Sequence, residues 1–290
     1  MKYDSVIIFG PTGGVGGGAA LEAHARGAKV WLAMRDTSKP IAGLTPEQEE
    51  KGRYTRAQAD LSDPASVANA VKQSGAKAAF TYVQRGPGVM KSTVQAMKDA
   101  GVEYVVLLSS RTVKGDLRTI EPNDFIPFYH AQAEIAIQDA GLALTAVRPG
   151  VFASNPAKKR SGQIQIAPAS PPPSVLVDRP SQSQTEVIYL HGPEIMTHNT
   201  LWETIQGVTG EPIEINHITK EQYLELAKGK VPAPVAEYLA RILDQGDISD
   251  RFPEELYAVA SKNVKTYTGR DPTSFAEYVA KHKEDFAPAK

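Results

Sequence analysis

The stretch Phe9–Asp36, FGPTGGVGGGAALEAHARGAKVWLAMRD, decides the fold of this 290-residue chain. Its glycines Gly10, Gly13 and Gly16 have the spacing GxxGxxG and lie between a β-rich run, SVIIFG, and a run of helical composition. In that context a glycine loop makes a tight turn and brings the backbone N–H groups of a helix start close to a phosphate. The stretch therefore predicts a strand, a phosphate-binding turn, a helix and a second strand.

The alternation of apolar runs and helical runs continues beyond this unit. We expect strands at residues 77–83, 102–110 and 142–150, and helices at 63–75, 89–101 and 128–141. Strands that alternate with helices of about a dozen residues indicate βαβ units, and continuous apolar runs suit strands buried on both faces. The predicted fold class is α/β, a doubly wound parallel sheet.

The pattern changes after Gly150. Residues 153–174 are polar and proline-rich, which favours an extended loop over regular structure. The remaining sequence predicts strands at 185–193 and 212–219, and helices at 199–210, 220–229, 232–246, 253–269 and 272–286. We therefore expect a nucleotide-binding domain over residues 1–155 and a smaller, mostly helical region over 156–290 that interleaves with it.

Composition excludes several classes of function. Thirty-two basic and 33 acidic residues give a net charge of −1, which favours neither nucleic acid nor an anionic membrane as a partner. The absence of cysteine excludes disulfides, a thiolate nucleophile and cysteine-ligated metal, and the six histidines show no ligand spacing. We predict no metal site. The first apolar run is too short for a signal peptide or a membrane span, so a cytoplasmic location is expected.

The end of the second predicted strand indicates which nucleotide binds. An acidic residue directly at this strand end favours NAD, because it hydrogen-bonds the ribose 2′-OH. Here Arg35 precedes Asp36, and Ser38 and Lys39 follow. A guanidinium can stack on adenine and pair with a 2′-phosphate, so we predict NADP(H). The alternative is that Arg35 is a solvated residue at the strand end.

Two further contacts to the nucleotide are expected. The hydroxyl of Thr12 lies within the glycine loop. Asp60 and Leu61 follow the third predicted strand, where the carboxylate could accept from the adenine amino group while the leucine packs near the ring. The equally weighted alternative is that Asp60 caps the next helix.

Several motifs together resemble one known family. They are GPTGGVG, the RD pair after the second strand, ADLSD, GLALTAVRPGVFASN, and the C-terminal runs EVIYLHGP and GRDPTSFAEYVAKHKEDF. In this combination the chain resembles the NmrA-like branch of the atypical short-chain dehydrogenases/reductases, in its fungal form. The resemblance implies a Rossmann domain with a seven-stranded parallel sheet and a smaller C-terminal region over the cofactor.

The usual catalytic pair of short-chain dehydrogenases is absent. These enzymes carry Tyr-x-x-x-Lys on the helix before the RP motif, and in this chain the lysine position holds His130 and the tyrosine position holds Ile126. A histidine can give or take a proton near neutral pH. His130 is thus a candidate acid/base or ribose-holding residue, and the alternative is a packed or surface histidine.

The resemblance extends the set of candidate residues. Strand ends supply Ser109, Ser110 and Tyr82, which with His130 are the candidate catalytic residues. Arg111, Phe152 and Asn155 are the candidate substrate contacts. The expected cofactor-binding residues are Gly10, Thr12, Gly13, Gly14, Val15, Gly16, Arg35, Ser38, Lys39, Asp60, Leu61, Thr81, Tyr82, His130, Pro149, Gly150, Val151 and Phe152.

Two functions are compatible with these residues. The first is an NADP(H)-dependent oxidoreductase of a small apolar cyclic molecule, such as a fungal secondary-metabolite enzyme acting on an indole alkaloid, with a redox-assisted cycloaddition as a variant. The second is a catalytically silent redox sensor that binds NADP(H) and regulates a partner protein. The basic run Lys158, Lys159 and Arg160 is interpreted as a solvated loop, with a site for a partner or a substrate anion as the alternative.

Overall fold

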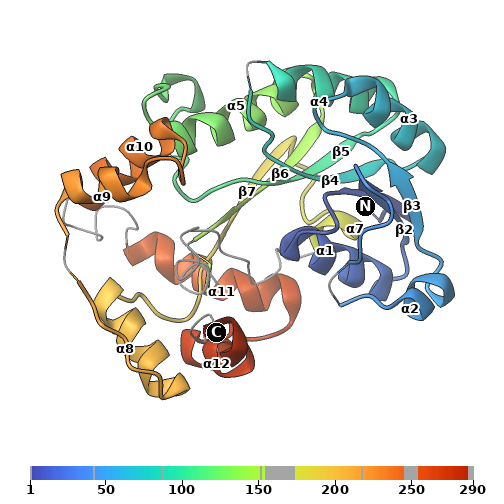
Figure 1. The fold of residues 1–290 in the computed structure, drawn as a ribbon. Helices are drawn as coiled ribbons and strands as arrows, with labels where there is room; N and C mark the ends of the chain where they lie inside the picture. Colours follow the sequence, from blue (N-terminus) through green and yellow to red (C-terminus); the bar gives the residue numbers. More distant parts are fainter. Residues whose placement is uncertain are drawn as a thin grey trace.

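The protein is built on one parallel sheet, seen in a computed structural model that describes residues 2–41, 43–86, 88–150, 152–153, 174–216, 218–244 and 254–286. Seven strands follow the order β3-β2-β1-β4-β5-β6-β7, and every neighbouring pair is parallel (Figure 1). The strands are β1 (Ser5–Phe9), β2 (Lys29–Met34), β3 (Thr55–Gln58), β4 (Ala78–Tyr82), β5 (Tyr104–Leu108), β6 (Ala143–Pro149) and β7 (Thr185–Leu190). The predicted doubly wound α/β fold is confirmed.

Helices cover both faces of the sheet (Figure 1). The first part of the chain forms α1 (Gly14–Ala25), α2 (Pro46–Lys51), α3 (Pro64–Ser74), α4 (Val89–Asp99), a 3-10 turn (Leu117–Thr119) and α5 (Phe125–Asp139). Alternate residues of each strand point to opposite faces, so Val6 and Ile8 pack with α1 and Ile7 and Phe9 pack with α3, α4 and α5. The sheet is therefore buried between two apolar layers, as its continuous apolar strands require.

The C-terminal region returns to the sheet. It contains α7 (Ser174–Val177), α8 (His198–Thr209), α9 (Lys220–Ala227), α10 (Ala233–Asp244), α11 (Glu254–Thr268), α12 (Phe275–Lys281) and α13 (Lys283–Phe286). β7 adds to the edge of β6, and α7 joins the apolar layer of α1. The division into domains at residue 155 stays a prediction, although β7 ties the two parts together. Within the described ranges, no helix is long and apolar enough to cross a membrane.

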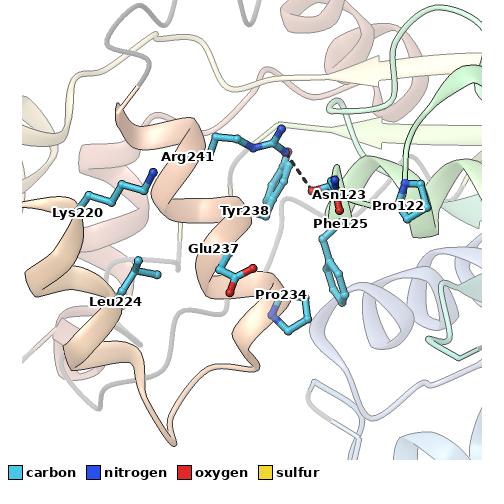
Figure 2. Close-up of a pocket in the computed structure, with 9 residues that line it drawn as sticks. All are labelled: Pro122, Asn123, Phe125, Lys220, Leu224, Pro234, Glu237, Tyr238 and Arg241. Carbon is cyan, nitrogen blue, oxygen red and sulfur yellow. Dashed lines mark hydrogen bonds between the residues drawn. The ribbon is translucent and has the colours of Figure 1, made fainter.

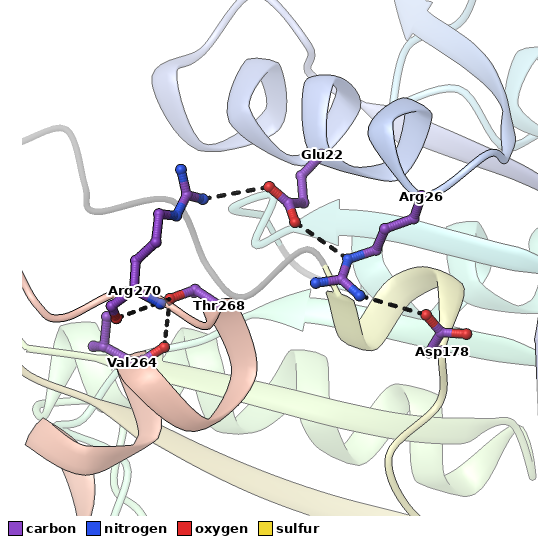
Figure 3. Close-up of polar contacts among 6 residues, drawn as sticks. All are labelled: Glu22, Arg26, Asp178, Val264, Thr268 and Arg270. Atoms are coloured by element: carbon purple, nitrogen blue, oxygen red, sulfur yellow. Dashed lines mark hydrogen bonds and ion pairs between the residues drawn. The ribbon is translucent and has the colours of Figure 1, made fainter.

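A charged cluster links the first helix to the end of the chain (Figure 3). Glu22 on α1 accepts from Arg26 Nε at 3.2 Å and from Arg270 at 3.3 Å, and Arg26 also pairs with Asp178 at 3.6 Å. Thr268 at the end of α11 accepts from the backbone N–H of Arg270 at 3.1 Å and so fixes the turn that carries this arginine. The contacts fasten α7 and the turn after α11 to α1.

Two predicted elements differ in the structure. The predicted strand at 212–219 does not form over its described residues, 212–216 and 218–219. Two of its three isoleucines, Ile215 and Ile218, are 39% and 47% exposed, and a strand needs a neighbouring strand to satisfy its backbone. The predicted helix at 272–286 is broken at His282, because Phe286 turns back into the cluster formed with Phe275 and Val279.

Candidate functional site

The glycine turn cannot accommodate a side chain at two of its positions, Gly10 and Gly16. Gly10 has φ +73°, in the left-handed region, and its carbonyl accepts from Gly13 N at 3.1 Å. A Cβ on Gly16 would lie 2.3 Å from the carbonyl oxygen of Gly10. Gly10 and Gly16 therefore shape the turn, while Thr12, Gly13 and Gly14 are exposed along it.

The start of α1 fits a pyrophosphate. Its N-cap, Gly13, supplies no side-chain hydrogen bond, and the first turn contains no acidic residue. The first N–H groups of a helix lack intrahelical acceptors and attract an anion. The turn also lies between β1 and β4, where the strand order reverses and open α/β sheets bind their ligands. The residues present thus fit the phosphates of a dinucleotide.

The loop after β2 exposes the side chains predicted to recognise the adenosine end. Arg35, Ser38 and Lys39 are all exposed. Asp36 Oδ1 accepts from Ser38 N at 3.0 Å and from Ser38 Oγ at 2.6 Å, and these bonds lower the pKa of Asp36. The Ser38 hydroxyl therefore already holds Asp36, which leaves Arg35 and Lys39 as the cations facing solvent on this loop.

Of the two predicted adenine contacts, Asp60 is half-buried and Leu61 is buried. Asp60 Oδ1 accepts from Ser62 N at 2.9 Å and Ser62 Oγ at 2.7 Å, which lowers the pKa of Asp60. The N-cap of α3 is Asp63, so the alternative that Asp60 caps this helix is wrong. Leu61 is buried in the core layer of α3 and α4, and its carbonyl accepts from Thr93.

Tyr82 at the end of β4 covers the glycine turn. A Cβ on Gly10 would lie 2.6 Å from Cε1 of the Tyr82 ring. Burial raises the pKa of Tyr82, the charge of Arg35 lowers it, and the charge of Asp60 raises it. Tyr82 is thus in contact with Gly10 and within electrostatic range of Arg35 and Asp60, so that four predicted cofactor residues gather here. Thr81, another predicted cofactor residue, directly precedes Tyr82 on β4 and is fully buried.

A buried network engages one of the two candidate serines. Ser109 Oγ donates to Glu134 Oε1 at 2.5 Å, and Arg148 donates to both oxygens of the same carboxylate, at 3.0 and 2.6 Å. Arg148 also donates to Tyr189 Oη at 2.8 Å. Ser110 instead contacts Thr112 at 2.8 Å and is half-buried. This arrangement favours Ser110 over Ser109 as a residue that reaches a substrate.

The contact of His130 with a backbone carbonyl defines the position of one of its protons. Its Nδ1 lies 2.7 Å from the carbonyl oxygen of Ile126. Because a carbonyl only accepts, Nδ1 carries the proton and Nε2 carries the lone pair. Burial lowers the pKa of His130, the bond to Ile126 and the charge of Glu134 raise it, and the charge of Arg85 lowers it. The lowered pKa favours the neutral form of the imidazole at the position where short-chain dehydrogenases carry a lysine cation.

A second histidine lies at the carboxyl edge of the sheet. His191 directly follows β7, and a Cβ on Gly150 would lie 2.9 Å from its Cδ2. Its ring stacks edge-on against Tyr257 of α11, with centroids 5.2 Å apart. Burial lowers the pKa of His191, and the charge of Arg111 adds to this effect. Sequence reasoning passed over His191, although a titratable residue after a parallel strand is itself a signal.

The remaining predicted residues are only partly placed. The backbone N–H of Arg111 donates to Pro149 O at 3.1 Å, and Gly150 N donates to Leu190 O at 2.8 Å, so the ends of β5, β6 and β7 meet. Phe152 is half-buried near them in sequence. Val151, Asn155 and the basic residues Lys158, Lys159 and Arg160 lie outside the described residues.

A cavity opens between the start of α5 and the C-terminal helices (Figure 2). Its volume is about 420 Å³, and Phe125 and Asn123 face Tyr238 and Arg241 of α10 across it. Arg241 donates to Asp124 Oδ1 at 2.6 Å, which anchors α10 to the start of α5. Among the described residues, the lining includes neither Arg111 nor Phe152 of the predicted substrate contacts. In the described part of the chain, no group of three or more histidine and acidic side chains could hold a metal ion.

Comparisons with known proteins agree with this geometry. The sequence model of a family described as NAD(P)H-binding matches residues 10–174. The nitrogen metabolite regulation-like protein bik4 of Gibberella fujikuroi is 38% identical, over 96% of this chain and 96% of its own length. The (4-alkanoyl-5-oxo-2,5-dihydrofuran-3-yl)methyl phosphate reductase of Streptomyces griseus is 26% identical, over 98% and 99%. A nucleoside-diphosphate-sugar epimerase structure from Staphylococcus aureus shares the fold, with TM-score 0.71 at 15% identity over 95% of this chain and 99% of its own.

Proposed function

Since the chain belongs to the NAD(P)H-binding family and, within it, to the NmrA-like proteins, we propose that it is an NADP(H)-dependent oxidoreductase of small, apolar, cyclic molecules. The observation that carries the proposal is the turn at Gly10, Gly13 and Gly16, which meets an uncapped α1 beneath Tyr82. When bound there, NADPH supplies a hydride, and the protein supplies orientation and proton transfer.

The choice of NADP(H) over NAD(H) rests on charge. Arg35 and Lys39 are exposed cations on the loop after β2, and either can pair with a 2′-phosphate. Asp36, the acid that would favour a free ribose 2′-OH, is held by Ser38 within the loop. These contacts favour the phosphorylated nucleotide.

Two histidines with lowered pKa values are the candidates for proton transfer. His130 presents Nε2 as an acceptor from α5, because its Nδ1–H is used by Ile126. His191 presents an imidazole at the edge formed by Gly150 and Leu190, within electrostatic reach of Arg111. A group that must release a proton during reduction needs to be protonated first. We assign His130 to hydrogen-bond acceptance. We assign His191, which is half-buried directly after β7, to proton delivery, because its lowered pKa makes the imidazolium that forms by proton uptake from solvent the stronger acid.

The substrate class follows from the lining available and from a relative. The cavity beside α5 begins at Phe125, five residues or about 7.5 Å along the helix from His130. Its aromatic and proline walls suit an apolar ring. Of its charged lining residues, Lys220 can pair with an acidic substituent, whereas Arg241 is held by Asp124 and Glu237 is itself an anion. The Streptomyces griseus relative is by name a reductase of an oxo-dihydrofuran carrying a phosphate. A fungal indole alkaloid, with or without cycloaddition, stays a hypothesis within this class.

The experiment is a turnover assay with purified full-length protein. Affinities for NADPH and NADH are measured first by fluorescence, and NADPH oxidation is then followed with a panel of cyclic enones, quinones and imines, neutral and acidic. We expect oxidation with at least one cyclic member. Tight NADPH binding with no turnover across the panel contradicts the oxidoreductase, and pull-downs with and without NADPH then test the sensor.

Replacement of His191 separates chemistry from binding. His191→Asn keeps a hydrogen-bonding side chain of similar reach but removes the titratable ring. We expect kcat to fall by about 10²- to 10⁴-fold, the range that general acid catalysis contributes, with the Kd for NADPH unchanged. The matched control is His24→Asn, since His24 stacks on Tyr54 at 4.6 Å on the outer side of α1 and should leave kcat unaltered. Equal kcat for His191→Asn and the wild type contradicts the assignment.

A further inference from the structure

The loop that carries Arg35 and Lys39 is held from β3 by one arginine. Arg56 lies on β3 opposite Leu32 of β2. Its NH1 group donates to the carbonyl oxygen of Thr37 and, at 2.8 Å, to that of Lys39. One guanidinium nitrogen on β3 therefore bonds two backbone carbonyls of the loop after β2, two residues apart.

Arg56 is itself fixed by a carboxylate from α2. Glu49 accepts from Arg56 Nε at 2.5 Å and from NH2 at 2.8 Å, a bidentate pair. The side chains are only 26% and 15% exposed, and the bonds from Glu49 raise the pKa of Arg56. Bidentate pairs of this kind are the strong and geometrically specific ones.

Glu49 is held in place by the local structure of α2. Thr45 and Gln48 form a reciprocal capping box, with Gln48 N donating to Thr45 Oγ1 at 3.2 Å and Thr45 N donating to Gln48 Oε1 at 2.9 Å. Glu49 N then donates to Thr45 O at 2.9 Å. The cap fixes the first turn of a helix too short to be stable alone.

We propose that Arg56 and Glu49 form a brace that sets the preference for NADP(H) over NAD(H) by holding the loop of Arg35 and Lys39 in the conformation that receives the 2′-phosphate. The inference rests on the proposed binding of NADP(H). Arg56 and Glu49 are positioning residues, because the guanidinium donors are already directed at Glu49, Thr37 and Lys39.

The brace acts through order and not through net charge. The pair Arg56–Glu49 is neutral as a unit, so the attraction for the phosphate comes from Arg35 and Lys39. Lys39 is further restricted because Pro40 follows it and disfavours the helical region for the preceding residue. An ordered loop loses less conformational entropy when it binds a ligand than a mobile loop does.

The decisive variant removes the brace and leaves the charge of the protein unchanged. In the double variant Arg56→Met with Glu49→Gln, one positive and one negative charge are lost together. We expect the Kd for NADPH to rise about tenfold, equivalent to about 1.4 kcal/mol, and the Kd for NADH to stay within about twofold. The control is Arg26→Met with Glu22→Gln, which removes a similarly shielded pair from α1 and should leave the ratio of the two Kd values unchanged.

A single variant distinguishes the brace from a direct phosphate ligand. Glu49→Gln frees the Arg56 guanidinium and adds one net positive charge. If Arg56 bound the phosphate, NADPH would bind more tightly to this variant. The brace predicts weaker NADPH binding instead, and faster tryptic cleavage after Arg35 in the nucleotide-free protein, since the loop is released.

The outcomes separate this inference from the function on which it rests. Equal wild-type affinity for NADPH and NADH overturns both the proposed preference and the brace. A wild-type preference for NADPH that the double variant retains, with an unchanged rate of cleavage after Arg35, overturns the brace alone. Thermal unfolding of each variant shows that it is folded at the assay temperature.

Discussion

The ring of Tyr82 lies against Gly10, so that a single added carbon on the glycine would meet the ring edge at 2.6 Å. One residue ends β4 and the other follows β1, the two strands between which the sheet order reverses. The contact places an aromatic surface over the phosphate-binding turn. Because Tyr82 is still 36% exposed, the ring can also face a ligand bound there.

The first prediction separates the Tyr82 ring from its hydroxyl. Tyr82→Phe should keep the Kd for NADPH within about twofold and keep kcat, since the contact with Gly10 is made by ring carbons. Tyr82→Ala should weaken NADPH binding about tenfold, because it removes the aromatic face that a bound nucleotide would cover, and complete burial of such a side chain is worth about 1.5–3 kcal/mol. Fluorescence titration measures both. A large loss of kcat in Tyr82→Phe would instead support the catalytic role predicted for its hydroxyl.

The second prediction concerns two glycines of the same turn. Gly16→Ala should destabilise the protein by about 1–3 kcal/mol and abolish tight nucleotide binding, because the new methyl group collides with a backbone oxygen that cannot rotate away. The free energy of unfolding of Gly13→Ala should lie within about 1 kcal/mol of the wild-type value. The added Cβ would lie 3.5 Å from Gly10 O, an ordinary van der Waals contact. Denaturant unfolding and NADPH titration test the pair.

The third prediction is a pH dependence of stability. The pKa of His130 is lowered from its ordinary value of 6.5, so the unfolded chain takes up a proton at this residue before the folded one does. The free energy of unfolding therefore falls as the pH drops below about 6.5. His130→Gln should reduce the fall in Tm between pH 7.5 and pH 5.5 (about one unit either side of that value). An identical fall in both proteins would show that His130 is solvated.

The fourth prediction concerns the buried pair Glu134–Arg148, whose side chains are 1% and 7% exposed. Glu134→Gln or Arg148→Met alone should cost about 3–5 kcal/mol, because each leaves the partner's charge buried and unpaired. The double variant should cost less than the sum of the two single variants, by about 1–3 kcal/mol. Urea unfolding of the four proteins measures this difference, and strict additivity would contradict a direct coupling.

The sequence predicts the nucleotide-binding half well because each element there carries its own signal. Asp63 and Pro64 begin α3 and Gly75 ends it with φ +59°, as local chemistry requires. The apolar runs of β5 and β6 can be buried on both faces only in a parallel sheet. The site at the turn follows from the same short-range pattern.

The elements that the sequence does not reveal depend on distant partners. Residues 212–219 alternate like a strand, but α11 packs along β7 and the segment pairs with no strand in its described residues. The role of Arg56 requires the backbone of a loop 17 to 19 residues away, and His191 comes next to Gly150 only because β7 pairs with β6. Periodicity cannot encode such pairings.

The place of β7 in the sheet has a consequence for synthesis and for expression of fragments. Every residue of β6 is buried, and its outer edge is covered only after residues 185–190 have emerged and paired. A fragment that ends at residue 155 would present β6 as an unprotected, mostly apolar edge, which is the geometry that recruits other chains into intermolecular sheets. The N-terminal part of the chain therefore cannot complete its sheet during synthesis until β7 has been made.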